Sequence, residues 1–450
     1  MTNRALLHSL LLAAWLAASL PARAERLSLD QAYRLAIRHN PNIAMLRERV
    51  AQAEAARHRA WSALKPSASF QGSYTHNDQE IVIDFSGMFP AGITPPSGFP
   101  SRSVYQLQDQ FAFTVGASLP IFRGPAYPRL SAARTGIEVA RLREVRSQQE
   151  FLLRVAQAYY QVVSREDAVK ALETKLGVDR KHLTVARTRL EVGQAPRSEV
   201  LRADLVATQD EQTLLAQRNG VEAARRALAI LIGVPDRPQV ERPAEPAAPS
   251  LSESEMVATA QTARLDLKAA DLSIRVARKS VEAVWMSFLP SLDLSWAYRW
   301  TEAQGFATNQ GMWNLMASLN VPIYDAGLRY ADLRDARSRL IEAREQQRAL
   351  NLDIETEVVR LRSDLASAVA GVVSARKAVT LAHTTLEDME ASFQVGAATQ
   401  LDVLDASQRL LDAELQLTSS LSNRDLSRLA ILHALGRFDP LRHQASVEGR

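Results

Sequence analysis

The stretch SLDLSWAYRW, residues 291–300, alternates apolar and polar side chains without interruption. On one side of an extended chain lie Leu292, Leu294, Trp296, Tyr298 and Trp300. The intervening side chains are small or polar, and successive side chains of a strand point to opposite faces. The stretch therefore predicts a strand with one apolar and one polar face. Its flanks are typical of long helices, so the sequence raises the question of what covers the apolar face.

Three further stretches alternate in the same way, at 67–75, 110–119 and 313–321. Each is about ten residues long, which suits a tilted strand that crosses an outer membrane with its apolar face to lipid. Interfacial aromatic residues would come from Trp296, Tyr298, Trp300 and Trp313. The alternative is one face of a soluble β-sandwich. Against it, the polar faces are mostly small and hydroxylic, and no second sheet is predicted to cover the aromatic ones.

Four strands leave two open edges, which hydrocarbon does not tolerate. The smallest barrel with a filled interior has about eight strands. We therefore expect copies of the chain to share one barrel: two copies would give a plugged interior, and three would give a passage. The segment 77–107 between the first two strands is rich in Gly and Pro, and we expect it to be a loop at the cell surface.

The sequence is duplicated. At an offset of 224, Leu27-Ser28 aligns with Leu251-Ser252 and Trp61 with Trp285; at an offset of 203, Gly193 aligns with Gly396. The predicted organisation is a first repeat at 25–235, a proline-rich linker at 236–250, a second repeat at 251–437 and a C-terminal tail at 438–450.

Each repeat has the same order of predicted elements: a helix, two strands, a very long helix, a turn that contains glycine, and a third helix. The predicted helices are 30–64, 127–191 and 197–232 in the first repeat, and 253–288, 328–395 and 400–435 in the second. A helix of about 65 residues reaches roughly 100 Å. Taken alone, this pattern fits either a filamentous coiled coil or a tube of helices.

Residues 1–24 have a positively charged start, an apolar run and the Ala22-Arg23-Ala24 pattern, which predict a signal peptide; the alternative is an uncleaved anchor. No later run of about 18 consecutive apolar residues predicts a spanning helix.

The chain has no cysteine, and its eight histidines show no metal-ligand spacing. No basic cluster indicates nucleic-acid binding, and no catalytic set or phosphate loop indicates an enzyme or a cofactor.

Two turns carry the strongest motif, RLEVGQAPRSEVLRAD at 189–204 and SFQVGAATQLDVLDAS at 392–407. Together with the Pro-Ser pairs at 66 and 290, IYDAGLR at 323–329 and the duplication, they make the chain resemble the TolC family of outer-membrane efflux factors. The resemblance implies a mainly α-helical fold with a membrane β-barrel. It implies a homotrimer with a twelve-stranded barrel in outer-membrane lipid, continued by a helical tunnel through the periplasm.

The resemblance also implies partners, namely a periplasmic adaptor and an inner-membrane pump. We expect an exit duct for small toxic molecules such as drugs or metals. The alternatives are a duct for secreted proteins with the same architecture and, from another class, a periplasmic coiled-coil scaffold without a pore.

The two turns have readable helix signals. Gly193 and Gly396 are predicted to end the long helices in a left-handed conformation. The next helices start near Pro196 and Thr399, and Thr399 with Asp402 has the spacing of a capping box. The residues expected to face the adaptor are Gly193, Pro196, Ser198, Gly396 and Thr399.

Asp402 and Asp405 are three residues apart and so share one helical face. By resemblance, they match the aspartates of the family's pore constriction, and Glu199 is assigned to the constriction with them; a ring of acids favours cations. The alternative is that the two aspartates only stabilise a helix N-terminus. The Tyr and Arg that close the tip in the family are Phe393 and Ala398 here, which leaves Arg197 and Arg202 as candidate substitutes.

Overall fold

The computed structural model describes residues 26–88, 93, 101–235, 237–303 and 309–440. The predicted signal peptide and the tail beyond residue 440 lie outside the described residues. The elements follow in the order α2 (Leu29–His39), α3 (Pro41–Ser62), β1 (Ser67–His76), β2 (Ile81–Asp84), β3 (Arg102–Gln106), β4 (Asp109–Phe122), α4 (Ala126–Glu191), α5 (Arg197–Ile232), α6 (Glu253–Ala263), α7 (Leu265–Met286), β5 (Ser291–Thr301), β6 (Gly311–Asn320), α8 (Leu328–Gln394) and α9 (Gln400–Ala434).

The chain divides into two compact units, and each takes residues from both halves of the sequence. Unit 1 comprises Met1–Glu48, Leu142–Leu267 and Ala349–Arg450, and unit 2 comprises Arg49–Arg141 and Lys268–Arg348. Unit 2 holds the six strands found among the described residues, and unit 1 holds the proline-rich segment and the turns that follow α4 and α8.

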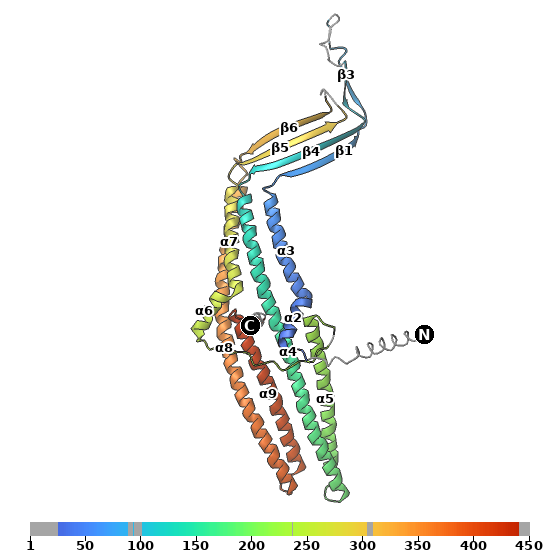
Figure 1. Ribbon diagram of the computed structural model, residues 1–450, viewed down its shortest axis with the longest axis vertical. Helices are drawn as coiled ribbons and strands as arrows, with labels where there is room; N and C mark the ends of the chain where they lie inside the picture. The colour runs from blue at the N-terminus through green and yellow to red at the C-terminus, as the bar shows by residue number, and fades with distance from the viewer. Residues whose placement is uncertain (1–25, 89–92, 94–100, 236, 304–308, 441–450) are drawn as a thin grey trace, which may run out of the picture. The chain divides into compact units, whose positions relative to one another are not determined.

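The sheet of unit 2 has four antiparallel strands in the order β1-β4-β5-β6 (Figure 1). Val115 of β4 lies opposite both Phe70 and Tyr298, and Tyr298 lies opposite Trp313. Directly opposed residues point to the same face, so the four alternating patterns combine into one apolar face. That face is uncovered in the chain, since Phe70 is 71% and Trp313 69% exposed. Strands β1 and β6 are the two edges of this sheet.

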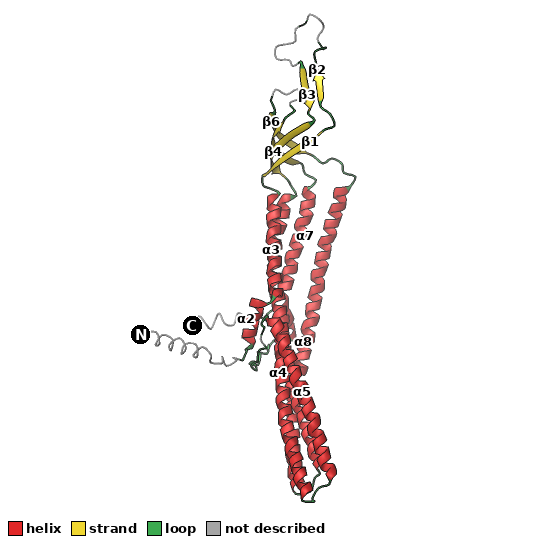
Figure 2. Ribbon diagram, turned by 90° about the vertical axis from the view of Figure 1, so that its right-hand side faces the viewer, coloured by secondary structure: helices red, strands yellow, loops and turns green. Residues whose placement is uncertain are grey.

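The sequence predicted that the segment 77–107 is a loop, but the structure shows strands within it. It contains β2 and β3, which pair with each other as a second, two-stranded sheet (Figure 2). The run Ile81-Val82-Ile83 is β-branched and favours a strand. The prediction was wrong because it gave more weight to the Gly and Pro residues further along the segment.

The second and third predicted helices of each repeat match α4, α5, α8 and α9 to within a residue. The first helix of each repeat, predicted as continuous, is instead broken. Asn40 is extended, with ψ 127°, because the following Pro41 disfavours a helical conformation at the preceding residue. Arg264 is extended as well, with ψ 131°, although no proline follows. Its side chain is held by carboxylates, as described below.

The core of unit 1 forms where α4 meets α2 and α5. Phe151, Val155 and Tyr159 of α4 cluster with Tyr33 of α2 and Leu228 of α5. The hydroxyl of Tyr159 lies 2.7 Å from the carbonyl oxygen of Leu27 and 2.6 Å from that of Glu241. The proline-rich segment is therefore joined to the bundle, and its described residues contain no helix.

Equivalent features recur at the sequence offsets of the duplication. Capping boxes begin α2 at Ser28 and α6 at Ser252. Gly233 and Gly436 both have positive φ, at 73° and 68°. The equivalence extends to packing. A Cβ on Gly233 would press against His39, and a Cβ on Gly436 would press against Ala263, which is the residue that aligns with His39 in the second repeat.

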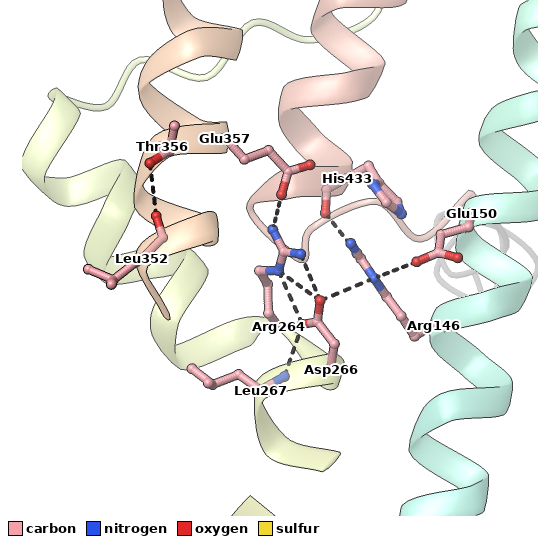
Figure 3. Close-up of polar contacts among 9 residues, drawn as sticks. All are labelled: Arg146, Glu150, Arg264, Asp266, Leu267, Leu352, Thr356, Glu357 and His433. Atoms are coloured by element: carbon pink, nitrogen blue, oxygen red, sulfur yellow. Dashed lines mark hydrogen bonds and ion pairs between the residues drawn. The ribbon is translucent and has the colours of Figure 1, made fainter. Parts of the chain in front are cut away.

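A largely buried polar cluster in unit 1 joins residues of α4, α8 and α9 to Arg264, which lies between α6 and α7, and to Asp266 at the start of α7 (Figure 3). The Arg264 guanidinium donates to Asp266 at 2.7 Å and to Glu357, while Arg146 lies 3.7 Å from Asp266 and donates to the carbonyl oxygen of His433. Burial and then the two arginines lower the pKa of His433 to about 3, so its ring stays neutral. Sequence analysis did not find this cluster, because its members come from distant segments.

One described helix, α8, contains an 18-residue window with a mean hydropathy of 1.3, apolar enough to span a membrane by length and composition; 11% of that window is buried. The sequence predicted no spanning helix because it contains no unbroken run of about 18 apolar residues. Length and composition do not distinguish a membrane span from a helix that packs against protein.

Replacing Gly233 by Ala should destabilise unit 1. The new Cβ would lie 2.9 Å from the Cβ of His39 and 3.0 Å from its carbonyl carbon, at a backbone φ of 73° that Ala adopts poorly. The matched control is Gly177→Ala in α4, where nothing lies within 4 Å and which should stabilise by about 0.5–1 kcal/mol. Melting temperatures of the purified proteins test this; equal shifts for both variants would contradict it.

Candidate functional site

The two turns that follow α4 and α8, residues 192–196 and 395–399, are together called the tip; both lie at the same end of unit 1 (Figures 1 and 2). In the first turn Gly193 has φ 74°, and the Gln194 N–H donates to the Arg189 carbonyl at 2.7 Å. In the second, Gly396 has φ 78°, and the Ala397 N–H donates to the Ser392 carbonyl at 2.8 Å. Both glycines therefore end a helix in the left-handed conformation that the sequence predicted.

The two following helices start differently. Pro196 is the N-cap of α5, one residue before the helix begins at Arg197, and its side chain makes no capping hydrogen bond. Thr399 caps α9 with a complete capping box: its N–H donates to Asp402 Oδ2 at 2.8 Å, and the Asp402 N–H donates to Thr399 Oγ1 at 3.3 Å. The Thr399 hydroxyl, and then its backbone N–H, hold the pKa of Asp402 below its usual value.

The three acids assigned to the constriction lie on two helices. Asp402 and Asp405 are exposed on α9, on the side away from the buried Val403, whereas Glu199 is half-buried in the first turn of α5. The Asp405 carboxylate forms an ion pair with Arg409 at 2.9 Å, one helical turn further along. The i,i+4 spacing of Asp405 and Arg409 is the sequence signal for this pair.

Phe393, at the end of α8, contacts the other hairpin of the tip. The Arg189 guanidinium lies 4.3 Å from the centroid of its ring, and the His182 ring lies edge-on to it at 6.3 Å. We call Arg189, His182 and Phe393 the aromatic clamp. Sequence analysis named Arg197 and Arg202 as candidate substitutes, but the structure shows no hydrogen bond or ion pair for either within its described residues.

The four predicted interfacial aromatics belong to the apolar face of the sheet. Trp313 is the most exposed of them, and Trp296 is also exposed. Trp300 stacks on Phe113 at 5.2 Å, and Tyr298 lies 6.2 Å from the same ring.

The opposite, polar face of the sheet carries a hollow of about 570 Å³. Its lining includes Gln71, Thr114 and Arg299. Near the end of β4, the Arg123 guanidinium forms an ion pair with Asp293 of β5 at 2.9 Å. The two faces of this sheet therefore suit two different environments, one apolar and one aqueous.

Comparison with known proteins gives a consistent result. The model of the outer membrane efflux protein family matches residues 32–234 and 256–437. The outer membrane protein TolC of Vibrio cholerae is 25% identical over 347 residues, which cover 73% of this chain and 77% of TolC. In fold, the chain is similar to two solved structures. One is the outer membrane protein VceC of Vibrio cholerae (TM-score 0.71, 21% identity, 91% of this chain and 96% of VceC). The other is the CmeC outer membrane channel of Campylobacter jejuni (TM-score 0.75, 17% identity, 94% of this chain and 88% of CmeC).

Replacing Thr399 by Ala should fray the start of α9, because the N-cap hydrogen bond to the Asp402 N–H is lost; such losses typically cost about 1 kcal/mol. Hydrogen exchange of residues 400–404 should become faster. The matched control is Ser198→Ala in the first turn of α5, a helix whose start has no side-chain cap.

Acidification should have the same effect on this helix start in the wild-type protein. Because the pKa of Asp402 is lowered in the folded protein, its carboxylate stabilises the helix start fully above the unfolded-state pKa. This stabilisation is lost as the pH falls through the folded-state pKa. Exchange at 400–404 that is unaffected by both Thr399→Ala and acid would contradict the capping role.

Proposed function

The chain belongs to the outer membrane efflux protein family, and from that premise we propose that it is the exit duct of a tripartite export system. It is an outer-membrane protein with the fold of the TolC-like channels. In this proposal, a periplasmic adaptor and an inner-membrane pump deliver small toxic molecules, such as drugs or metals. These pass through the duct without any bond being broken.

The observation that carries this proposal is the open sheet of unit 2. Its apolar face is uncovered, and the backbone groups on the outer sides of β1 and β6 need partners in a membrane. Four strands from each of three chains give a closed barrel of twelve, with β6 of one chain beside β1 of the next. The aromatic face would then meet lipid, and the polar face with Arg299 would line the lumen.

Threefold symmetry would also bring the tips together. Asp402 and Asp405 would form a ring of six carboxylates, two from each of three chains, with Glu199 nearby. The pairing of Asp405 with Arg409 reduces the net charge of that ring, so Asp402 would dominate its field. Gly193, Pro196, Ser198, Gly396 and Thr399 would present their turns to the adaptor.

The aromatic clamp would hold the two hairpins of each tip together in the closed duct. A cation over an aromatic ring contributes about 0.5–1 kcal/mol at an exposed site, and three clamps would act at once in a trimer. The clamp would thus replace the hydrogen bond and ion pair that Phe393 and Ala398 cannot make.

The proposed function is tested with the detergent-purified protein in planar lipid bilayers. We expect discrete channels and an oligomer whose mobility on a gel changes on heating. A protein that stays in solution without detergent as a monomer and forms no channels would contradict the proposal.

The double variant Asp402→Ala, Asp405→Ala should lose most of the channel's preference for cations over anions, because a ring of fixed negative charge attracts cations. Asp335→Ala is the matched control, an exposed carboxylate of α8 in unit 2 that pairs with Arg339. Reversal potentials in a salt gradient measure the preference. Unchanged selectivity in the double variant would refute the assignment of the constriction.

Phe393→Leu should increase the fraction of time that the channel is open, because leucine keeps apolar bulk but offers no ring to Arg189. Arg189→Ala should act in the same direction. Arg197→Ala, which removes a nearby cation that has no such contact, should leave the opening unchanged. If single-channel records show the same open fraction in all three variants, the clamp does not hold the tip closed.

A further inference from the structure

A buried charged triad, Lys175, Asp179 and Asp210, lies between α4 and α5 in unit 1. The side chains of Lys175 and Asp179 are only 4% and 1% exposed, and that of Asp210 is 13% exposed. The Lys175 ammonium donates to Asp179 Oδ2 at 2.8 Å and also to Asp210 Oδ2. The triad is not part of the tip, and the proposed transport path does not use it.

The charges of the triad do not balance when both carboxylates are ionised. One ammonium then faces two carboxylates, and Asp179 Oδ1 is buried without a hydrogen-bond partner. The charged groups that act on Asp179 are Lys175 of its own helix and Asp210 of α5. A buried, uncompensated negative charge is costly.

Further titratable groups near the triad are His182, one turn along α4, and Glu390 of α8, which lies 3.9 Å from the His182 ring. Burial lowers the pKa of His182, and neither group is among those that act on the charge of Asp179. Close to the triad in sequence, the apolar cluster of Leu172, Leu176, Leu214 and Leu411 packs α4, α5 and α9 together, so α9 contributes leucine here. A single proton on the pair of carboxylates makes the triad neutral and supplies a hydrogen bond between the two acids.

The energetics favour that proton at neutral and lower pH. Burial, and then the hydrogen bond to Asp210, raises the pKa of Asp179 to about 7, against the opposing effect of Lys175. An aspartate in an unfolded chain has a pKa of about 3.9. The stabilisation linked to this proton is therefore complete below that value and is lost as the pH rises toward 7.

The triad lies on the same face of α4 as the aromatic clamp. Positions 175, 179, 182, 186 and 189 recur every three or four residues, the spacing of one helical face. Asp179 is ten residues from Arg189, which is roughly 15 Å along the helix. A change in how α4 packs at Asp179 therefore acts on the helix face that carries His182 and Arg189.

We propose that Lys175, Asp179 and Asp210 form a proton-operated lock that holds α4 against α5 when protonated and loosens this hairpin when the proton leaves. The lock itself depends on the buried charges of unit 1 and not on the proposed function. Its consequence, a tip that opens more readily at alkaline pH, rests on the proposed function. The exposed pairs Arg180–Glu211 and Arg187–Asp204 join the same two helices but have no buried charge to neutralise.

The lock is tested by hydrogen exchange of residues 172–186 and 205–214 in the full-length protein at pH 5.5 and 8.5, corrected for the intrinsic pH dependence of exchange. In the wild type we expect at least about tenfold faster corrected exchange at pH 8.5, since one pKa unit of coupling corresponds to a factor of ten. Asp179→Asn keeps the shape and can donate to Asp210, so its exchange should be slow at both pH values.

Two further variants make the test specific. Asp210→Asn also makes the triad neutral at every pH, and it serves as the second reporter if Asp179→Asn folds poorly. Asp204→Asn, which removes an exposed carboxylate from α5, should keep the wild-type pH response. A wild type without a pH response, or asparagine variants of the triad that retain it, would overturn the lock.

Single-channel recordings at the same two pH values test the consequence separately. A wild-type open fraction that rises at pH 8.5, and that does not rise in Asp179→Asn, supports regulation of the tip. A conducting channel whose open fraction ignores pH overturns that regulation. A protein that never conducts counts against the proposed function, and the exchange result still decides the lock.

Discussion

The unpaired backbone of strands β1 and β6 is the constraint on which the rest of this structure depends. A sheet with one aromatic face and two free edges is not stable by itself in lipid, and four strands do not close. The chain is an outer-membrane protein by its family, and we propose that this sheet is the part of it that lies in the membrane. In the proposed trimer, closure is reached by a shared barrel, and the same symmetry would bring the three tips together.

The helices of unit 1 use buried charge in two different ways. Around Arg264 and Asp266, oppositely charged groups satisfy one another and fix a helix break that no proline enforces. Around Asp179, two carboxylates face one ammonium, and a proton on one carboxylate makes the group neutral. The first arrangement, whose carboxylates are partly exposed, is suited to rigid support. The second, whose Asp179 is almost fully buried, is suited to a response to pH.

Much of the fold could be predicted because it is periodic. The ends of α4 and α8 follow from glycine signals, and the apolar face of the sheet follows from strict alternation along each strand. The features that the sequence did not reveal are contacts between distant segments, such as Phe393 with Arg189 and Lys175 with Asp210. No local pattern encodes these contacts, because they arise only when the helices pack. The break at Asn40 was readable from Pro41, whereas the break at Arg264 depends on such contacts.

The most direct test of the shared barrel is a disulfide between chains. The protein has no cysteine, so one cysteine in β1 and one in β6 can pair only with each other or with the same positions in another copy. Within one chain, β1 and β6 are three strand spacings apart, roughly 14 Å, and a disulfide requires Cα atoms within about 7 Å. Scanned pairs should therefore give covalent trimers on a non-reducing gel. Monomers alone, or a series that ends at dimers, would contradict closure by three chains.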